Sequence, residues 1–139
     1  MIRPATDADI PHLVESSRSH YRTWRKPGMG VFDAGIAWVT LEAALADEDQ
    51  AIFTDDEHSG WVWMSFYPSP CSGDTYAGVR AWLTDIPGRG GLLMRRAIRE
   101  AQARKATLLT AHTELQGAAS ALRRLGFSEE HKTFVRLLA

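Results

Sequence analysis

The sequence predicts an α/β fold, with helices packed on a mixed sheet, in a single domain that spans residues 1–139. Three observations support this prediction. The length is typical of one compact domain. Segments with the two-residue period of strands alternate with segments that have the helical period. Late in the chain, a strand, a glycine turn, a helix and a strand follow one another, which predicts a right-handed crossover between parallel strands.

The N-terminal third predicts a short strand and two helices. Residues 1–4 fit the strand, and Thr6 with Asp9 forms a Thr-x-x-Asp capping signature. Apolar residues then recur close to a helical period, namely Ile10, Leu13, Val14, Tyr21 and Trp24. The turn-forming stretch 26–30 ends this helix, and a second helix is predicted within residues 33–46.

The middle of the chain predicts three strands. Residues 50–54 and 61–67 flank a polar turn and fit an antiparallel hairpin, and residues 75–83 fit a third strand. Trp61 and Trp63 are two positions apart, so their side chains should share one face of the sheet.

The C-terminal part predicts two helices and two strands. A helix over 92–105 precedes a strand over 106–113, and a short helix over 117–125 precedes a strand over 132–138. With the elements above, this predicts a central mixed sheet of about six to seven strands flanked by about four helices.

The charges divide the chain into two parts. The net charge is −1, which argues against a general nucleic-acid binder. Residues 1–60 hold 5 basic and 11 acidic residues, whereas residues 80–139 hold 11 basic and 5 acidic residues. Such an asymmetry can mark an anion site in the basic part. It is also compatible with two parts that interleave in space.

The remaining composition predicts a cytoplasmic protein without a membrane partner. Cys71 is the single cysteine, so an internal disulfide is excluded and a reducing compartment fits. No apolar run approaches the ~20 residues that span a bilayer, and the first residues lack the apolar core of a signal peptide.

The segment Gly88-Arg89-Gly90-Gly91, between a predicted strand and helix, is a candidate anion site. Glycines allow close approach of a ligand, and the first N–H groups of a helix favour negative charge. A Walker P-loop is excluded because Gly-Lys-Ser/Thr is absent, and a dinucleotide fingerprint would need a glycine where Leu93 stands. The pyrophosphate loop of an acyl-CoA-binding acetyltransferase and a glycine turn without a ligand remain open.

Three segments carry a family resemblance. They are Ile2-Arg3-Pro4-Ala5-Thr6 followed by Asp9, then Gly-Arg-Gly-Gly-Leu-Leu-Met at 88–94, and Ala-Ala-Ser-Ala-Leu-Arg-Arg-Leu-Gly-Phe at 118–127. With them the chain resembles the GNAT superfamily of N-acetyltransferases: its opening strand and helix, its Arg-x-x-Gly-x-Gly/Ala motif and its late helix ending in Leu-Gly-Phe. The resemblance spans nearly the full length.

The resemblance implies a sheet whose two central parallel strands splay apart, with acetyl-CoA as co-substrate in the gap. Backbone groups near Leu83 and Thr84 would bind the pantetheine arm. The N–H groups of four residues would hold the pyrophosphate, namely Gly88, Arg89, Gly90 and Gly91. The implied reaction is direct attack of an amine, of a small molecule or a protein, on the acetyl thioester.

Three positions depart from the family pattern. Asp85 stands where the family has Arg or Gln, Leu122 stands where it commonly has Tyr, and Leu115 stands where it commonly has Asn. The family's tyrosine protonates the leaving thiolate. Because a thiol has a pKa of about 8.5, an unprotonated leaving group costs only roughly 2 kcal/mol at neutral pH. Its loss therefore predicts a slower reaction, not an impossible one.

Candidate catalytic residues follow from this chemistry. The candidates for the base that deprotonates the amine are His112, Glu114, Asp85 and Asp74. Ser120 is a candidate proton donor near the missing tyrosine. For each of them a solvated or structural role is the alternative. The other histidines show no metal-ligand spacing, so no metal is expected.

Three function classes remain open. The first is an acetyl-CoA-dependent N-acetyltransferase with an unidentified amine acceptor. The second is a catalytically weak or inactive CoA-binding or regulatory module, favoured by Leu122 and Asp85; a protein-interaction domain without CoA is a third. We expect no nucleic-acid partner, and the sequence leaves a homodimer open.

Overall fold

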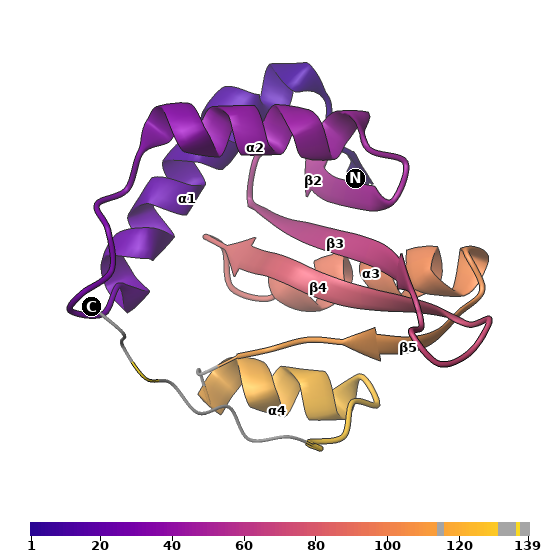
Figure 1. Cartoon of the computed structure of the whole chain (residues 1–139). Coiled ribbons are helices and arrows are strands. Elements are labelled where there is room, and N and C mark those ends of the chain that lie inside the picture. Colours follow the sequence, from indigo (N-terminus) through magenta and orange to yellow (C-terminus); the bar gives the residue numbers. More distant parts are fainter. Residues whose placement is uncertain (114–115, 131–135, 137–139) are drawn as a thin grey trace.

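The structure is a computed structural model that describes residues 1–113, 116–130 and 136. In this part of the chain five strands form one sheet in the order β1-β2-β3-β4-β5 (Figure 1). They are β1 (Ile2–Pro4), β2 (Gln50–Asp55), β3 (Gly60–Pro68), β4 (Thr75–Thr84) and β5 (Ala106–Thr110). Neighbours are antiparallel except β4 and β5, which are parallel. The strand predicted over 132–138 lies, apart from Arg136, outside the described residues.

Helices cover both faces of the sheet. They are α1 (Ile10–Trp24), α2 (Ala34–Ala46), α3 (Arg89–Ala103) and α4 (Gln116–Arg124). The first two lie together on one face, and α3 lies on the other as the crossover between β4 and β5 (Figure 1). The α/β prediction with a mixed sheet and four helices is thereby confirmed, with five strands among the described residues where about six to seven were predicted.

Each face has its own apolar core. The core under α3 contains Val62, Met64 and Phe66 of β3 together with Leu93 of α3 and Leu122 of α4. The core under α1 and α2 combines Leu13 and Leu41 of these helices with Ile52 of β2 and Trp61 of β3. Since successive strand residues point to opposite faces, alternate residues of β2 and β3 contribute to the two cores.

Two boundaries differ from the prediction. The helix predicted from residue 92 begins at Arg89, because Gly88 adopts a φ of 87° and turns the chain directly into it. Gly90 and Gly91 are therefore in the first helical turn and not in a loop. The strand predicted over 106–113 ends at Thr110, so His112 lies in the segment after the strand. No described helix is long and apolar enough to cross a bilayer.

Candidate functional site

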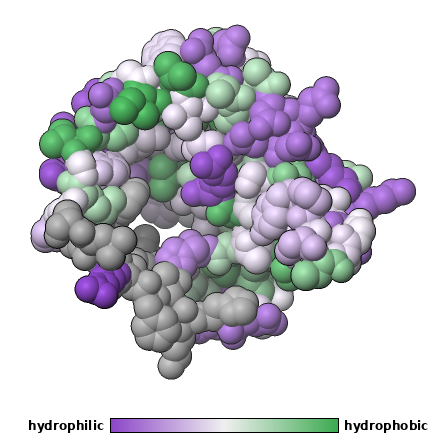
Figure 2. Space-filling model, viewed as in Figure 1, coloured by the Kyte–Doolittle hydropathy of each residue, from purple (hydrophilic) through white to green (hydrophobic). Residues whose placement is uncertain are grey.

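The parallel strands β4 and β5 pair over only part of their length. Their aligned residues run from Thr75 with Ala106 to Gly78 with Thr110, whereas β4 continues to Thr84. Residues 79–84 therefore have no strand partner on this side among the described residues. The backbone groups of alternate residues on such an edge are free to bind an extended ligand. The space-filling view shows a hollow beside the end of β4 (Figure 2).

A β-bulge lies where the two strands part. Val79 aligns with Met64 of β3 and Ala81 with Trp63, so the intervening Arg80 has no counterpart on β3. A bulge bends its strand and increases the local twist. The Arg80 guanidinium stacks on the Trp63 ring at 4.2 Å, on the face that carries α1 and α2. The bend thus accounts for the separation of β4 from β5.

The start of α3 lies at the open end of this split. Arg89 N–H donates to the Ile86 carbonyl at 3.3 Å, and the first N–H groups after it have no acceptor within the helix. No atom of the described residues lies within 4 Å of a Cβ placed on Gly88 or Gly91, so both border open space in this part of the chain. Free donors, a helix N-terminus and room for a ligand together fit a phosphate group.

Gly90 has a different environment from its neighbours. A Cβ at Gly90 would lie 3.2 Å from both Trp82 Cζ2 and Thr84 Cγ2, which is closer than ordinary contact. The Gly90 carbonyl oxygen also accepts a hydrogen bond from Trp82 Nε1 at 2.9 Å. This glycine therefore allows α3 to approach β4, and its role in a ligand site is confined to its N–H.

Two side chains from other segments contact the charged residues of the connection between β4 and α3. Arg89 Nη2 lies 3.5 Å from Glu57 Oε2, and His20 Nε2 lies 3.7 Å from Asp85 Oδ1. The Asp85 carboxylate thus has a partner on α1. All four side chains are partly exposed, so these contacts are weak and open to competition by a ligand.

Asp55 is the buried acid of this region. Its burial opposes ionisation, but Ser59 donates to it from both its hydroxyl and its backbone N–H, and Arg89 adds a favourable charge. The result is a pKa below the ordinary value of 3.8. Asp55 is therefore ionised at neutral pH, and its bonds to Ser59 brace the β2–β3 turn.

Comparison with known proteins gives fold-level matches alone. No protein-family model matches the sequence, and a search of curated proteins finds no match. An acetyltransferase of Trypanosoma brucei superposes with a TM-score of 0.76 at 11% identity, covering 99% of each chain. A transcriptional regulator from Bacillus halodurans C-125 gives 0.78 at 20% identity, over 98% of this chain and 97% of that one.

A third match has a bound ligand in its description. An aminoglycoside acetyltransferase from an uncultured soil metagenomic sample, solved in complex with sisomicin, gives a TM-score of 0.74 at 13% identity. The match covers 100% of this chain and 96% of that one. Most of the matched structures carry an acetyltransferase name. The chain has the GNAT fold.

The GNAT fold separates the predicted catalytic candidates. Asp85 lies at the open end of the split and contacts His20. His112 is exposed in the segment after β5, and Ser120 is half-buried on α4. Glu114 lies outside the described residues. None of the hydrogen bonds or ion pairs between described residues joins Asp85, His112 and Ser120, so no catalytic pair among them is assembled.

Leu122 is 7% exposed and belongs to the core under α3. The α4 position at which the GNAT pattern commonly has a tyrosine therefore contributes packing here. His20 and Glu57 were missed from the sequence, because their contacts join segments that no local pattern relates. The one signal in the sequence was the charge of Asp85 and Arg89, which indicates that each could have a partner of opposite charge.

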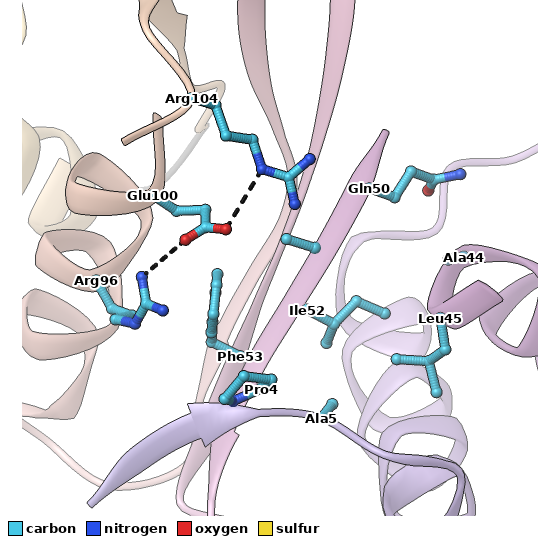
Figure 3. Close-up of a pocket in the computed structure, with 11 residues that line it drawn as sticks. Pro4, Ala5, Ala44, Leu45, Gln50, Ile52, Phe53, Arg96, Glu100 and Arg104 are labelled. Atoms are coloured by element: carbon cyan, nitrogen blue, oxygen red, sulfur yellow. Dashed lines mark hydrogen bonds and ion pairs between the residues drawn. The ribbon is translucent and has the colours of Figure 1, made fainter. Parts of the chain in front are cut away.

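A separate pocket of about 240 Å³ lies at the far edge of the GNAT sheet, between α2 and α3 (Figure 3). Its charged side chains are already paired, since Glu100 contacts Arg96 at 3.2 Å and Arg104 at 3.3 Å. The two guanidinium groups also stack on Phe53 and Phe66 at 4.1 and 4.2 Å. These contacts fasten α3 to the sheet, so we assign this pocket a structural role.

Proposed function

We propose that the chain is an acetyl-CoA-dependent N-acetyltransferase that acts on an amine of a small molecule or a protein. The observation that carries this proposal is the split between β4 and β5 with the start of α3 at its open end. An extended amide chain fits the free edge of β4, and an anionic group fits the N–H groups of the helix. A pyrophosphate joined to a pantetheine arm has both features.

The residues present fit this co-substrate. The N–H groups of Gly90 and Gly91 would hold the pyrophosphate at the first turn of α3, after the Gly88 turn and beside the Arg89 guanidinium. Backbone groups of Val79–Thr84, which include Leu83 and Thr84, would bind the amides of the arm. Acetyl-CoA supplies an activated acetyl thioester, and the protein contributes its binding and orientation.

Gly91 is the position for the decisive test. Its Cβ would meet open space at the third residue of α3, where Glu is compatible with a stable helix. Gly91→Glu places a carboxylate next to the pyrophosphate, whereas Gly91→Gln places an uncharged group of the same shape. We expect calorimetry to show that Gly91→Glu binds CoA at least about tenfold more weakly than Gly91→Gln.

Two outcomes would reject the assignment. The first is that wild-type protein shows no CoA binding by calorimetry. The second is that Gly91→Glu and Gly91→Gln bind CoA equally. Release of CoA thiol from acetyl-CoA, measured with spermidine, sisomicin and a lysine-containing peptide, then tests transfer itself.

A CoA-binding regulatory module is the second candidate, and the burial of Leu122 favours it. With a leucine in the core, this position of α4 supplies no hydroxyl for proton transfer. This candidate predicts CoA binding that is sensitive to Gly91→Glu, together with no thiol release for any amine. Thiol release above the rate without protein would exclude it.

A further inference from the structure

The phenol of Tyr67 lies at the closed end of the split. Gly78 is the last β4 residue aligned with β5, where it faces Thr110. A Cβ on Gly78 would lie 3.4 Å from Thr110 Oγ1, 3.6 Å from Tyr67 Cε1 and 4.0 Å from the Tyr67 hydroxyl oxygen. The absence of a side chain at Gly78 thus leaves a small space that a phenol and an alcohol border from two sides.

Tyr67 points to the face that carries α1 and α2. Its neighbour Phe66 is buried in the core under α3, so the Tyr67 side chain projects to the opposite side. Figure 1 looks onto this side of β4 and β5, with α3 behind the sheet. The Tyr67 ring packs edge-on against Tyr76 with 6.0 Å between centroids, and Tyr67 is 42% exposed. The ring is therefore held by a neighbour while part of the residue remains exposed.

The proposed function brings the thioester to the same place. With the pyrophosphate at the start of α3, the pantetheine arm runs along residues 84 to 79 of β4. The six residues of this edge span about 20 Å. Pairing of Thr75–Gly78 with β5 stops the arm from going further, so the sulfur ends close to Gly78. Among the described residues, Thr110 and Tyr67 supply the side-chain atoms nearest to a Cβ on Gly78.

We propose that Tyr67 is a catalytic residue that protonates the thiolate leaving group; this inference rests on the proposed function. The amine nitrogen forms a bond to the acetyl carbon, and the carbon–sulfur bond breaks with its electron pair going to sulfur. The phenol O–H proton moves to that sulfur, which leaves CoA as the thiol. The phenolate regains a proton from water, and the new amide nitrogen releases its extra proton to water, so protons and charge balance.

A phenol suits this transfer better than an alcohol. Its ordinary pKa of about 10 lies close to the 8.5 of a thiol, so proton transfer to a developing thiolate is nearly balanced. An aliphatic hydroxyl such as that of Thr110 is far less acidic. It would donate a hydrogen bond to the thiolate without transferring its proton. The proton donor that α4 lacks at Leu122 is in this way supplied from β3.

Bound CoA allows a test that needs no acceptor. Its thiol is titrated by ultraviolet absorbance, with desulfo-CoA as a reference that lacks the thiol alone. Because a hydrogen bond from Tyr67 stabilises the thiolate, the thiol pKa in the Tyr67→Phe complex should be about one unit higher than in the wild-type complex. Tyr76→Phe removes the hydroxyl of the neighbouring tyrosine and should leave the thiol pKa unchanged.

Kinetics give the second measurement. With any amine that the protein acetylates, Tyr67→Phe should lower kcat about 10²-fold while KM for acetyl-CoA stays the same. An unchanged thiol pKa in Tyr67→Phe, with CoA still bound, would overturn the role of Tyr67 and leave the proposed function intact. An equal change in Tyr76→Phe would overturn it as well. Absence of CoA binding by the wild type would instead overturn the proposed function itself.

Discussion

Trp82 donates its indole N–H to the carbonyl oxygen of Gly90 across 2.9 Å, and this bond ties the end of β4 to the first turn of α3. The edge of the indole ring also occupies the space that a Gly90 side chain would need. The position of the candidate anion site is therefore set by β4 itself. Gly91, one residue further, borders open space.

This contrast predicts opposite effects of the same substitution at adjacent glycines. Gly90→Ala places a methyl group 3.2 Å from Trp82 and Thr84, so we expect the free energy of unfolding to fall by about 1–3 kcal/mol. Gly91→Ala meets no atom and replaces glycine in a helix, so it should raise the free energy of unfolding by about 0.5–1 kcal/mol. Urea denaturation measures both. Equal effects of the two substitutions would contradict the described packing.

Asp9 makes the stability of the fold depend on pH. The residue is 2% exposed, and its carboxylate accepts hydrogen bonds from Arg3 at 2.8 and 2.9 Å. These bonds are the main cause of a pKa well below the ordinary 3.8; burial opposes them, and the Thr6 N–H and His58 assist. Because the unfolded chain then binds a proton at higher pH than the folded one, Asp9 stabilises the fold above about pH 4 and less as the pH falls.

Urea denaturation as a function of pH tests this contribution. We expect the stability of the wild type to decline between about pH 5 and pH 3. Asp9→Asn should be less stable at neutral pH by about 3 kcal/mol, with a shallower decline towards acid. Asp7→Asn is a matched control, since the described hydrogen bonds include none to the Asp7 side chain. A decline of the same steepness in Asp9→Asn would assign the acid dependence to other groups.

The exposed ion pair between Arg89 and Glu57 predicts a competition with CoA. Glu57 Oε2 lies 3.5 Å from Arg89 Nη2, and the same guanidinium would attract the pyrophosphate. Glu57→Gln should therefore strengthen CoA binding a few-fold at low salt, and the gain should shrink as salt is added. Arg89→Gln should weaken binding, and the double variant should resemble Arg89→Gln. Calorimetry at two salt concentrations measures this. Stronger binding in Glu57→Gln that persists when Arg89 is also replaced would show that the two side chains act independently.

Periodicity was sufficient to predict most of the fold. The change from a helical to a two-residue period placed α1, α2, β2, β3 and β4 within a few residues of their observed bounds. The start of α3 was misplaced because glycine was interpreted as a helix breaker, whereas Gly90 is in the helix to let it approach Trp82. The end of β5 was misplaced because a strand ends where its partner bends away, and the bulge at Arg80 has no local signature.

The site was predictable only in part. The glycine turn could be located because its chemistry resides in consecutive residues. Glu57 lies 32 positions before Arg89, and His20 reaches Asp85 from α1, so both contacts exist only in the folded chain. Tyr67 likewise could not be selected from the sequence, because its importance depends on the cross-strand position of Gly78. Which amine is accepted depends on surfaces that no motif encodes.

The unpaired segment of β4 is a sheet edge inside the molecule and not at its rim. Exposed edges invite other chains to add a strand, and such addition leads to aggregation. Here β4 and β5 are joined at Thr75–Gly78, so the edge can be entered from one end alone. Its amide groups can stay hydrated in the empty protein and exchange water for a slender ligand. The fold thus exposes unsatisfied backbone to a small molecule while restricting access by another polypeptide.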